Sequence, residues 1–298
     1  MHQSVLLEEV LTYLDPQPGD VILDATLGSG GHAKAIIECI AEKGFFIGMD
    51  RDAEALERAE RTIGLHDNVC VVQANFRDLD KVLEQTSVHR LDGILFDLGV
   101  SSEQLESPER GFSFLKEGPL DMRMDQTIGQ TASELVNDLS QSELTSLFYR
   151  FGGEPRAKLV AAKIVVRRQK QPLRTTGELA EVIKSCYRGH FFRIHPATRV
   201  FQALRIAVNR ELECLETGLR KAIQSVVPGG RIVVISFQSL EDRIVKRVFM
   251  EGKIERKVKI LTKKVVRPVE DEITRNPRSR SAKLRAVEKA GEGYEANI

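Results

Sequence analysis

Cysteine is scarce in this chain of 298 residues, and long apolar runs are absent. The four cysteines are widely spaced and form no C-x-x-C pair: Cys39, Cys70, Cys186 and Cys214. This spacing argues against structural zinc and against a disulfide framework, so we expect buried free thiols and no metal site. Apolar runs are too short for a membrane span, and acids interrupt the apolar positions near the N-terminus, where a signal peptide would lie. We therefore expect a cytoplasmic protein.

A strong net charge is also missing, since the formal value is only +1, but the charges are unevenly distributed. Residues 150–210 contain 14 Lys and Arg against 3 Asp and Glu, and residues 243–289 contain 16 against 6. The rest of the chain is correspondingly acidic. Two basic surfaces on an acidic body are typical of a protein that binds a polyanion such as a nucleic acid, although a solvated charged face would give the same composition.

The chain is organised around Val21–Ala33, a segment that lacks Lys and Arg. Its first three residues form an apolar run bounded by glycines, which predicts a buried parallel strand. Gly28, Gly30 and Ala33 then follow a G-x-G-x-x-A spacing, and Gly31 adds another position without a side chain. Such a turn lets a ligand approach the backbone just before a helix, although a purely structural turn would look similar.

A second apolar strand, Phe45–Gly48, is followed by Asp50, which lies 22 residues after Gly28. An acid about 20 residues beyond the first glycine typically holds a ribose. Two ligands fit such a unit, a dinucleotide and S-adenosylmethionine. A pyrophosphate favours basic side chains, whereas a cationic sulfonium favours carboxylates, and acids stand here at Asp24 and Asp50. The residues therefore favour S-adenosylmethionine.

Alternating apolar strands and amphipathic helices predict an α/β fold, a doubly wound, seven-stranded Rossmann-like methyltransferase sheet with an inserted all-helical domain. The expected strands cover residues 21–23, 45–48, 69–72, 91–96 and 232–235, and two edge strands fall within 254–266 and 282–287. The alternation stops after residue 102, where capping boxes at Ser140 and Thr175 open helices instead. We expect a methyltransferase domain over 1–105 and 198–298, and a helical domain for RNA recognition over 106–197.

Two helices are expected to flank the sheet. Ser4 can cap the first of them, which ends at Asp15-Pro16. Apolar residues stepping by three and four from Val208 to Val226 predict one long helix, ended by Pro228-Gly229-Gly230.

Polar or aromatic residues follow four of the expected strands: Asp24, Asp50, Asn75-Phe76 and Asp97. Ligands of open α/β sheets bind beyond the carboxyl ends of the strands. These residues therefore predict a site along one edge of the sheet.

Several stretches closely resemble the RsmH, or MraW, family of methyltransferases, and they span nearly the whole chain in the family's order. They are SVLLEE near the N-terminus, GSGGH at 28–32, DRD at 50–52, FDLGVSS at 96–102, RGFSF at 110–114, GPLDMRMD at 118–125, HPATRVFQALRIAVN at 195–209, SLEDRIVK at 239–246 and NPRSRS at 276–281. Two positions depart from the family pattern. Gln238 stands where His is usual, and Gly153 replaces the first acid of a G-E-E.

The resemblance implies an S-adenosylmethionine-dependent enzyme that methylates the N4 amino group of a cytidine in the decoding region of 16S rRNA, cytidine 1402 in rRNA numbering. It implies that Gly30, Gly31 and His32 line the methionine end of the cofactor. Asp50 would bind the ribose hydroxyls and Phe76 would pack on the adenine. The remaining cofactor residues are expected to be Gly28, Asp97 and Gln104.

Cytosine N4 is a poor nucleophile, so an acceptor for its proton should assist methyl transfer. Asp97 is the candidate for that role, with cofactor binding alone as the alternative. The target base must leave its stack, and Phe112 and Phe114 are candidates for gripping it, although either could simply pack in a core. Phosphate contacts are expected from Arg123, Arg199, Arg278 and Arg280. The expected partner is 16S rRNA within the small ribosomal subunit, and a homodimer stays open.

Three other functions share parts of this pattern. An NAD(P)-dependent oxidoreductase would use the same glycine unit but leaves the basic segments unexplained. A non-catalytic, RNA-binding ribosome-assembly factor would keep the basic segments without activity. A DNA amino-methyltransferase would share the chemistry, but such enzymes usually carry a D/N/S-P-P-Y motif, and the corresponding stretch here is Asp97-Leu98-Gly99-Val100.

Overall fold

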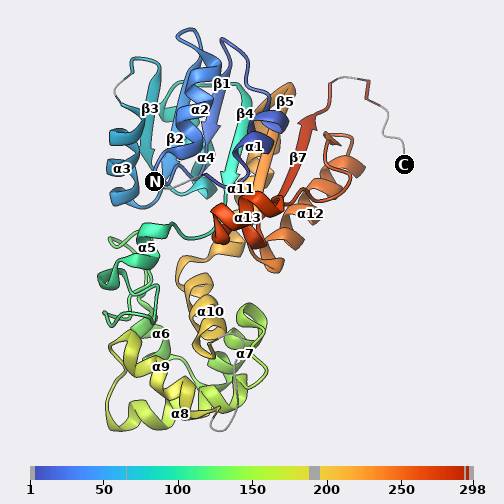
Figure 1. Ribbon diagram of the computed structural model, residues 1–298. Helices are drawn as coiled ribbons and strands as arrows, with labels where there is room; N and C mark the ends of the chain where they lie inside the picture. The colour runs from blue at the N-terminus through green and yellow to red at the C-terminus, as the bar shows by residue number, and fades with distance from the viewer. Residues whose placement is uncertain (1–3, 65, 188–194, 292, 295–298) are drawn as a thin grey trace. The chain divides into compact units, whose positions relative to one another are not determined.

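The computed structural model describes residues 4–64, 66–187, 195–291 and 293–294. Two compact units make up the chain (Figure 1). The sheet unit comprises residues 1–99 and 212–298, and the helical unit is Val100–Glu211. Arg188 and Arg193, which belong to the first basic segment of the sequence, lie outside the described residues. Within the described parts of the chain, no helix is long and apolar enough to cross a membrane.

The sheet unit is built on seven strands in the order β3-β2-β1-β4-β5-β7-β6. The first five strands along the chain pair in parallel, and β7 runs antiparallel to both of its neighbours. The strands are β1 (Val21–Asp24), β2 (Phe45–Asp50), β3 (Val69–Gln73), β4 (Leu91–Asp97), β5 (Val226–Ser236), β6 (Val258–Ile260) and β7 (Lys283–Lys289). The strand order reverses between β1 and β4, which is where ligands bind in doubly wound sheets. The predicted Rossmann-like fold is confirmed.

Helices cover both faces of this sheet (Figure 1). One apolar core packs the sheet against α1 (Leu7–Leu14), α2 (Gly31–Ile40) and α3 (Ala53–Ile63). The other packs it against α4 (Leu79–Gln85), α11 (Glu211–Ser225) and α12 (Ser239–Ile254). The central strands are buried on both sides, so they read in the sequence as continuous apolar runs rather than as alternating ones.

The helical unit has its own core. It contains α5 (Ser102–Glu106), α6 (Ala132–Asp138), α7 (Gln141–Gly152), α8 (Ala157–Lys170), α9 (Thr176–Ser185) and α10 (Ala197–Asn209). The expected capping boxes at Ser140 and Thr175 are present, and others lie at Ser101 and Thr131. Phe148 of α7 and Phe201 and Leu204 of α10 lie in one apolar cluster, so α10 belongs to this unit. The unit therefore extends beyond residues 106–197 at both ends.

Three local expectations were wrong. No single helix runs from Val208 to Val226, because Arg210 adopts a left-handed conformation (φ 49°) between α10 and α11. Ser4 does not cap α1, whose N-cap residue is Leu6, with φ 55° and no side-chain hydrogen bond to the helix. Strand β7 is not an edge strand, because it lies between β5 and the short β6.

Candidate active site

The glycine turn after β1 is held by the end of the neighbouring strand. Gly28 and Gly30 have φ values of 54° and 80°, which favour glycine, and Gly30 is the N-terminal capping residue of α2. A side chain at Gly30 would meet the Cα atom of Ala59 at 3.3 Å, so the turn lies close to α3. The turn thus leads the chain from the carboxyl end of β1 into α2.

Asp50 ties this turn to the end of β2. Its Oδ2 atom accepts a hydrogen bond from the Gly28 N–H at 2.9 Å, and its Oδ1 atom accepts one from the Asp52 N–H at 2.9 Å. Burial raises the pKa of Asp50, and the two N–H donors oppose that rise. Asp52 in turn caps α3 by accepting from the Glu54 N–H. Asp50 is therefore a fixed part of the turn, and its expected contact with the ribose hydroxyls stays a prediction.

Asp97 ends β4, and its backbone N–H donates to the hydroxyl of Thr26 just beyond β1. Its Oδ2 atom lies 3.6 Å from Nδ1 of His32. Its Oδ1 atom is buried and has no hydrogen-bond partner among the described residues. Burial raises the pKa of Asp97 from 3.8 to about 7. A buried carboxylate oxygen without a donor is costly, and it indicates that a ligand supplies the missing interaction.

Asp24 adds a second carboxyl group with an altered proton affinity. Its Oδ1 atom accepts from the Thr26 N–H at 3.0 Å. Burial raises the pKa of Asp24 to about 7, and His32 lowers it in part. The carboxyl edge of β1, β2 and β4 therefore carries Asp24, Asp50 and Asp97, each less acidic than in water.

The imidazole of His32 points into the protein, with 6% of the residue exposed. Its Nε2 atom lies 2.9 Å from the carbonyl oxygen of Val5. Desolvation lowers the pKa of His32, while Asp24 raises it in part. The side chain therefore has little surface for lining a pocket, whereas its backbone lies in the first turn of α2.

Residues that bear on this site were missed by sequence reasoning. Thr26 bridges β1 and β4, and Val5 fixes the His32 ring. Glu272 of α13 (Glu270–Arg275) accepts from the Leu6 N–H at 2.8 Å, a contact between residues 266 apart in the chain. No local pattern marks such partners, because only the fold brings them together.

This arrangement fits a cationic cofactor. Three carboxyl groups share one edge of the sheet, of which Asp24 is buried and Asp50 and Asp97 are partly buried. One of their oxygens lacks a donor, and the intervening turn presents backbone rather than basic side chains. A sulfonium would stabilise the ionised form of these acids, whereas a pyrophosphate would be repelled by them. Within the described residues, no three His, Cys, Asp or Glu side chains are grouped as metal ligands would be.

Two of the expected aromatic contacts are largely buried. Phe76 begins a short 3₁₀ helix (Phe76–Asp78), packs edge-on against Phe96 at 5.7 Å, and is only 9% exposed. Phe112 is 6% exposed within the core of the helical unit. The structure therefore gives Phe112 a packing role, and the expected packing of Phe76 on the adenine stays a prediction.

Phe114 and Gln104 belong to the helical unit. Phe114 stacks on the ring of His195 with centroids 4.5 Å apart. Gln104 completes a capping box with Ser101 at the start of α5. Its predicted part in cofactor binding therefore stays a prediction.

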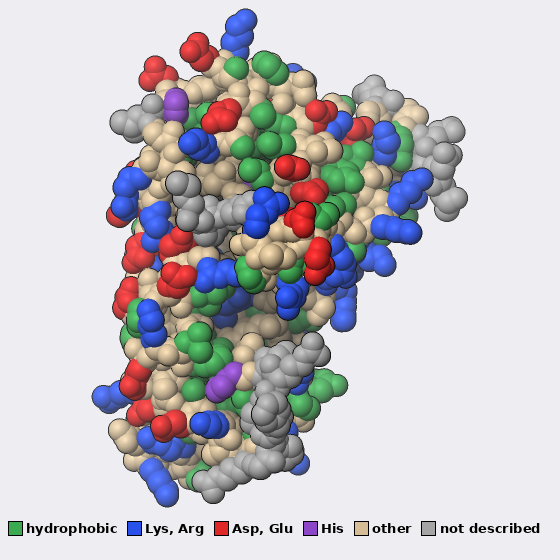
Figure 2. Space-filling model, viewed as in Figure 1, with side chains coloured by type: hydrophobic (Ala, Val, Ile, Leu, Met, Phe, Trp, Pro, Cys, Tyr) green, Lys and Arg blue, Asp and Glu red, His purple; other side chains and the backbone are tan. Residues whose placement is uncertain are grey.

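The predicted phosphate contacts fall into two groups. Arg123 grips the carboxylate of Asp121 through Nε and Nη2, both at 2.8 Å, so its charge is largely neutralised. The exposed arginines are Arg199, at the start of α10, and Arg278 and Arg280, in the 3₁₀ helix Pro277–Ser281. Figure 2 shows Lys and Arg side chains gathered beside α12. These exposed cations are the better candidates for binding a polyanion.

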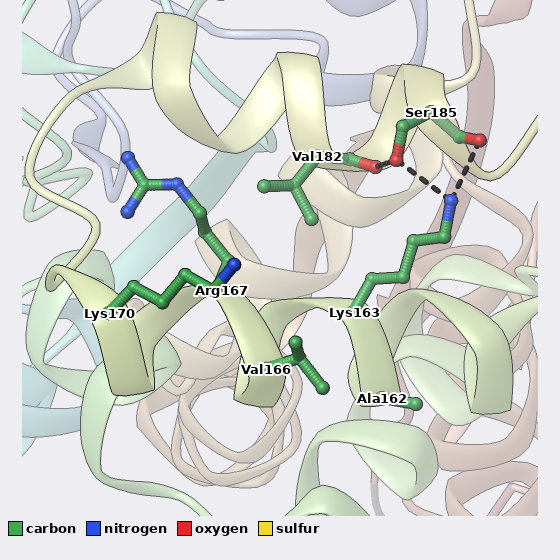
Figure 3. A pocket seen from close by; sticks show the side chains of 7 residues that line it. All are labelled: Ala162, Lys163, Val166, Arg167, Lys170, Val182 and Ser185. Atoms are coloured by element: carbon green, nitrogen blue, oxygen red, sulfur yellow. Dashed lines mark hydrogen bonds between the residues drawn. The ribbon is translucent and has the colours of Figure 1, made fainter.

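A groove of about 420 Å³ lies between α8 and α9 (Figure 3). It is lined by Ala162, Lys163, Val166, Arg167, Lys170, Val182 and Ser185. Lys163 donates to the backbone oxygen of Ser185 at 2.8 Å, and Arg167 donates to the backbone oxygen of Gln171 at 2.8 Å. Lys163 of α8 is thus held at the end of α9, and Arg167 is held at the end of α8, so the groove is a weak anion site.

The two departures from the family pattern have local structural roles. Gly153 ends α7 with φ 57°, a conformation that favours glycine. Gln238 precedes α12, and its N–H donates to Glu241 at 3.0 Å.

Comparisons with known proteins show the family of the chain. The model of the MraW methylase family matches residues 1–290. Ribosomal RNA small subunit methyltransferase H of Pelobacter propionicus is 50% identical, over 97% of this chain and 98% of that protein. The protein of the same name from Thermomicrobium roseum is 47% identical, over 97% of this chain and 93% of that protein. Among solved structures, an rRNA methylase from Streptococcus thermophilus aligns over 98% of this chain and 99% of that chain, at 10% identity and a TM-score of 0.44. By the family match and these identities, the chain belongs to the MraW methylase family.

Proposed function

We propose that the chain transfers a methyl group from S-adenosylmethionine to the N4 amino group of a cytidine in the decoding region of 16S rRNA. The observation that carries the proposal is the Asp97 carboxyl group at the carboxyl end of β4, whose buried Oδ1 atom lacks a donor. Membership of a methylase family supports the reaction class. The names of the relatives support small-subunit rRNA as the substrate.

The chain's own residues would hold the cofactor in a defined direction. The backbone at Gly28, Gly30 and Gly31 would lie against its methionine end, and Asp50 would accept hydrogen bonds from the ribose hydroxyls. Asp50 keeps lone pairs for this, because each of its oxygens accepts one N–H in the structure. When bound, the cofactor supplies a methyl group on positively charged sulfur.

Asp97 would act on the amine. Bound S-adenosylmethionine would supply the methyl group, its sulfur keeping the electron pair of the broken bond, and the amino nitrogen that receives the methyl group would have to lose one proton. Asp97 Oδ1 is the available acceptor, and a bound sulfonium would favour the ionised form of the carboxyl group. Exclusion of water and alignment of the reacting atoms would supply the rest of the rate enhancement.

The helical unit and the exposed arginines would position the RNA. Arg199, Arg278 and Arg280 are suited to phosphate contacts, which give binding but no sequence selection. The target base would have to leave its stack to reach Asp97. The two separate basic segments favour an assembled small ribosomal subunit, in the cytoplasm, as the substrate. A homodimer is compatible with this proposal.

A ribosome-assembly factor without activity is the second candidate, and the complete set of carboxyl groups disfavours it. A test compares the chain with its Asp97→Asn variant, using labelled S-adenosylmethionine and small subunits that lack the modification. We expect label in rRNA from the unaltered chain, and a loss of at least about a hundredfold in the variant. Calorimetry on both proteins separates lost chemistry from lost cofactor binding. Full-rate transfer by a variant that binds the cofactor normally would remove the catalytic role of Asp97.

A further inference from the structure

Phe237 is an aromatic residue beside the candidate site that the reaction described above does not use. It directly follows β5, which lies next to β4 in the sheet (Figure 1). In the register of these two parallel strands, Asp97 pairs with Ile235, and the Leu98 N–H donates to the Ile235 oxygen at 3.0 Å. Phe237 therefore lies just past Asp97, about 7 Å further along the direction of the strands.

Side-chain alternation places the Phe237 ring on the same face of the sheet as the Asp97 carboxyl group. Successive residues of a strand point to opposite faces, so residues two apart share a face. Leu95 and Ile235 both lie in the core between the sheet and α1–α3, and Phe237 packs against the same core. Asp97 follows Leu95 by two residues, as Phe237 follows Ile235. The carboxyl group and the ring thus project from neighbouring strands toward one side of the sheet.

The ring of Phe237 is partly exposed, and its position is fixed. The backbone N–H of Phe237 donates to Oε2 of Glu241, in the first turn of α12, at 3.0 Å. Gly99 approaches from the other strand with φ 118°, and a Cβ atom there would lie 3.5 Å from Cδ2 of Phe237. Because residue 99 is glycine, it places no side chain against the ring. A fixed and partly exposed phenyl ring is suited to stacking on a flat ligand.

We propose that Phe237 stacks on the target cytosine and holds the amino group of that base at Asp97. The inference rests on the proposed function, which brings an unstacked cytosine to this carboxyl group. An extruded base loses the stacking of its neighbours in the RNA, and an aromatic side chain replaces it. The two residues divide the task, since stacking is indifferent to base identity, whereas a carboxylate accepts from the cytosine amino group.

The other aromatic candidates are less suited to this role. Phe112 and Phe114 belong to the helical unit and pack in or against its core. Phe76 follows β3, which lies three strands away from β4, and it is almost fully buried. Phe237 combines partial exposure with a place on the strand next to Asp97.

Three variants separate stacking from simple packing. Phe237→Leu keeps an apolar side chain but removes the aromatic ring, whereas Phe237→Tyr keeps the ring. Phe45→Leu is the matched control, because Phe45 is also partly exposed but begins β2, at the end of the strands opposite the carboxyl edge. Thermal unfolding and calorimetry with S-adenosylmethionine check that each variant is folded and binds the cofactor.

Methylation of small subunits that lack the modification gives the first readout. We expect Phe237→Leu to lower kcat/KM for the subunit about tenfold, and Phe237→Tyr to stay within about twofold of the unaltered chain. The affinity for S-adenosylmethionine should change by no more than about twofold, because the ring acts on the base and not on the cofactor. Phe45→Leu should match the unaltered chain. A Phe237→Leu enzyme with unchanged kcat/KM, or one whose loss is matched by lost cofactor affinity, would overturn the proposal.

The second readout needs no activity. A Phe237→p-benzoylphenylalanine variant is irradiated with small subunits and S-adenosylhomocysteine, which allows binding without transfer, and the crosslinked rRNA nucleotide is mapped by reverse transcription. We expect a crosslink at a cytidine of the decoding region, and none there from the same substitution at Phe45. No crosslink, or one elsewhere in the rRNA, would contradict the stacking. If the unaltered chain methylates no rRNA, the proposed function fails, and the crosslink still judges Phe237 separately.

Discussion

Replacing Asp97 by Asn should stabilise the ligand-free protein above neutral pH while it removes activity. The pKa of Asp97 is about 7 in the folded state against 3.8 as the ordinary value. The folded state therefore binds this proton more tightly than the unfolded chain. The stability that the protonated group contributes is complete below about pH 4 and is lost as pH rises through 7. An amide, which never ionises, escapes that loss.

The size of the effect follows from the shift. About 3 pH units correspond to about 4 kcal/mol, and the side chain's exposure of 26% allows some solvent screening, which reduces this to about 2–3 kcal/mol. The Asn side chain also suits the site, since its NH₂ group can donate to the Nδ1 atom of His32. The stability of Asp97→Asn relative to the unaltered chain should be about 2 kcal/mol greater at pH 8 than at pH 5. For a unit of this size, that difference corresponds to about 4–8 °C in melting temperature.

Thermal unfolding of the ligand-free proteins at pH 5 and pH 8 measures the difference. Glu84→Gln, which removes an exposed acid elsewhere in the sheet unit, is the control and should change neither value by more than about 0.5 kcal/mol. A variant that is equally affected at both pH values, or is destabilised at pH 8, would refute the argument that burial governs the ionisation of Asp97.

Three further predictions concern other parts of the chain. Gly111→Ala should destabilise the helical unit by about 3 kcal/mol in thermal unfolding, because the residue has φ 71° and a Cβ atom would lie 2.2 Å from the Pro119 oxygen; a neutral change would contradict this geometry. Ser87→Gly should raise stability by about 1 kcal/mol, since Ser87 is exposed and left-handed at φ 54°, and a lower melting temperature would count against it. Changing Arg278 and Arg280 together to Ala should reduce the salt dependence of RNA binding by about 2 in the slope of log affinity against log salt, with cofactor affinity unchanged; an equal slope in filter binding would exclude phosphate contacts there.

The sequence predicted those parts of the candidate site that depend only on the strands and turns in which they lie. Asp24, Asp50 and Asp97 follow apolar runs, and buried parallel strands have that pattern whatever surrounds them. Gly28 and Gly30 were found for the same reason, because a left-handed turn before a helix favours glycine.

The rest depends on contacts between distant residues. The bond of Val5 to His32 and that of Leu6 to Glu272 arise only after the sheet has formed. The break at Arg210 was hidden because the apolar spacing continues on both sides of it, and a single left-handed residue leaves that spacing intact. Arg123 was predicted to contact phosphate, and only the coordinates show how closely Asp121 holds it.

The most direct test of the account is to identify the methylated nucleoside. Small subunits lacking the modification are incubated with the chain and S-adenosylmethionine, and the rRNA is digested to nucleosides and to mapped fragments for mass spectrometry. The account predicts N4-methylcytidine at one site in the decoding region. A different methylated nucleoside, or none despite measurable cofactor binding, would contradict the assignment of Asp97 as the acceptor of an amine proton.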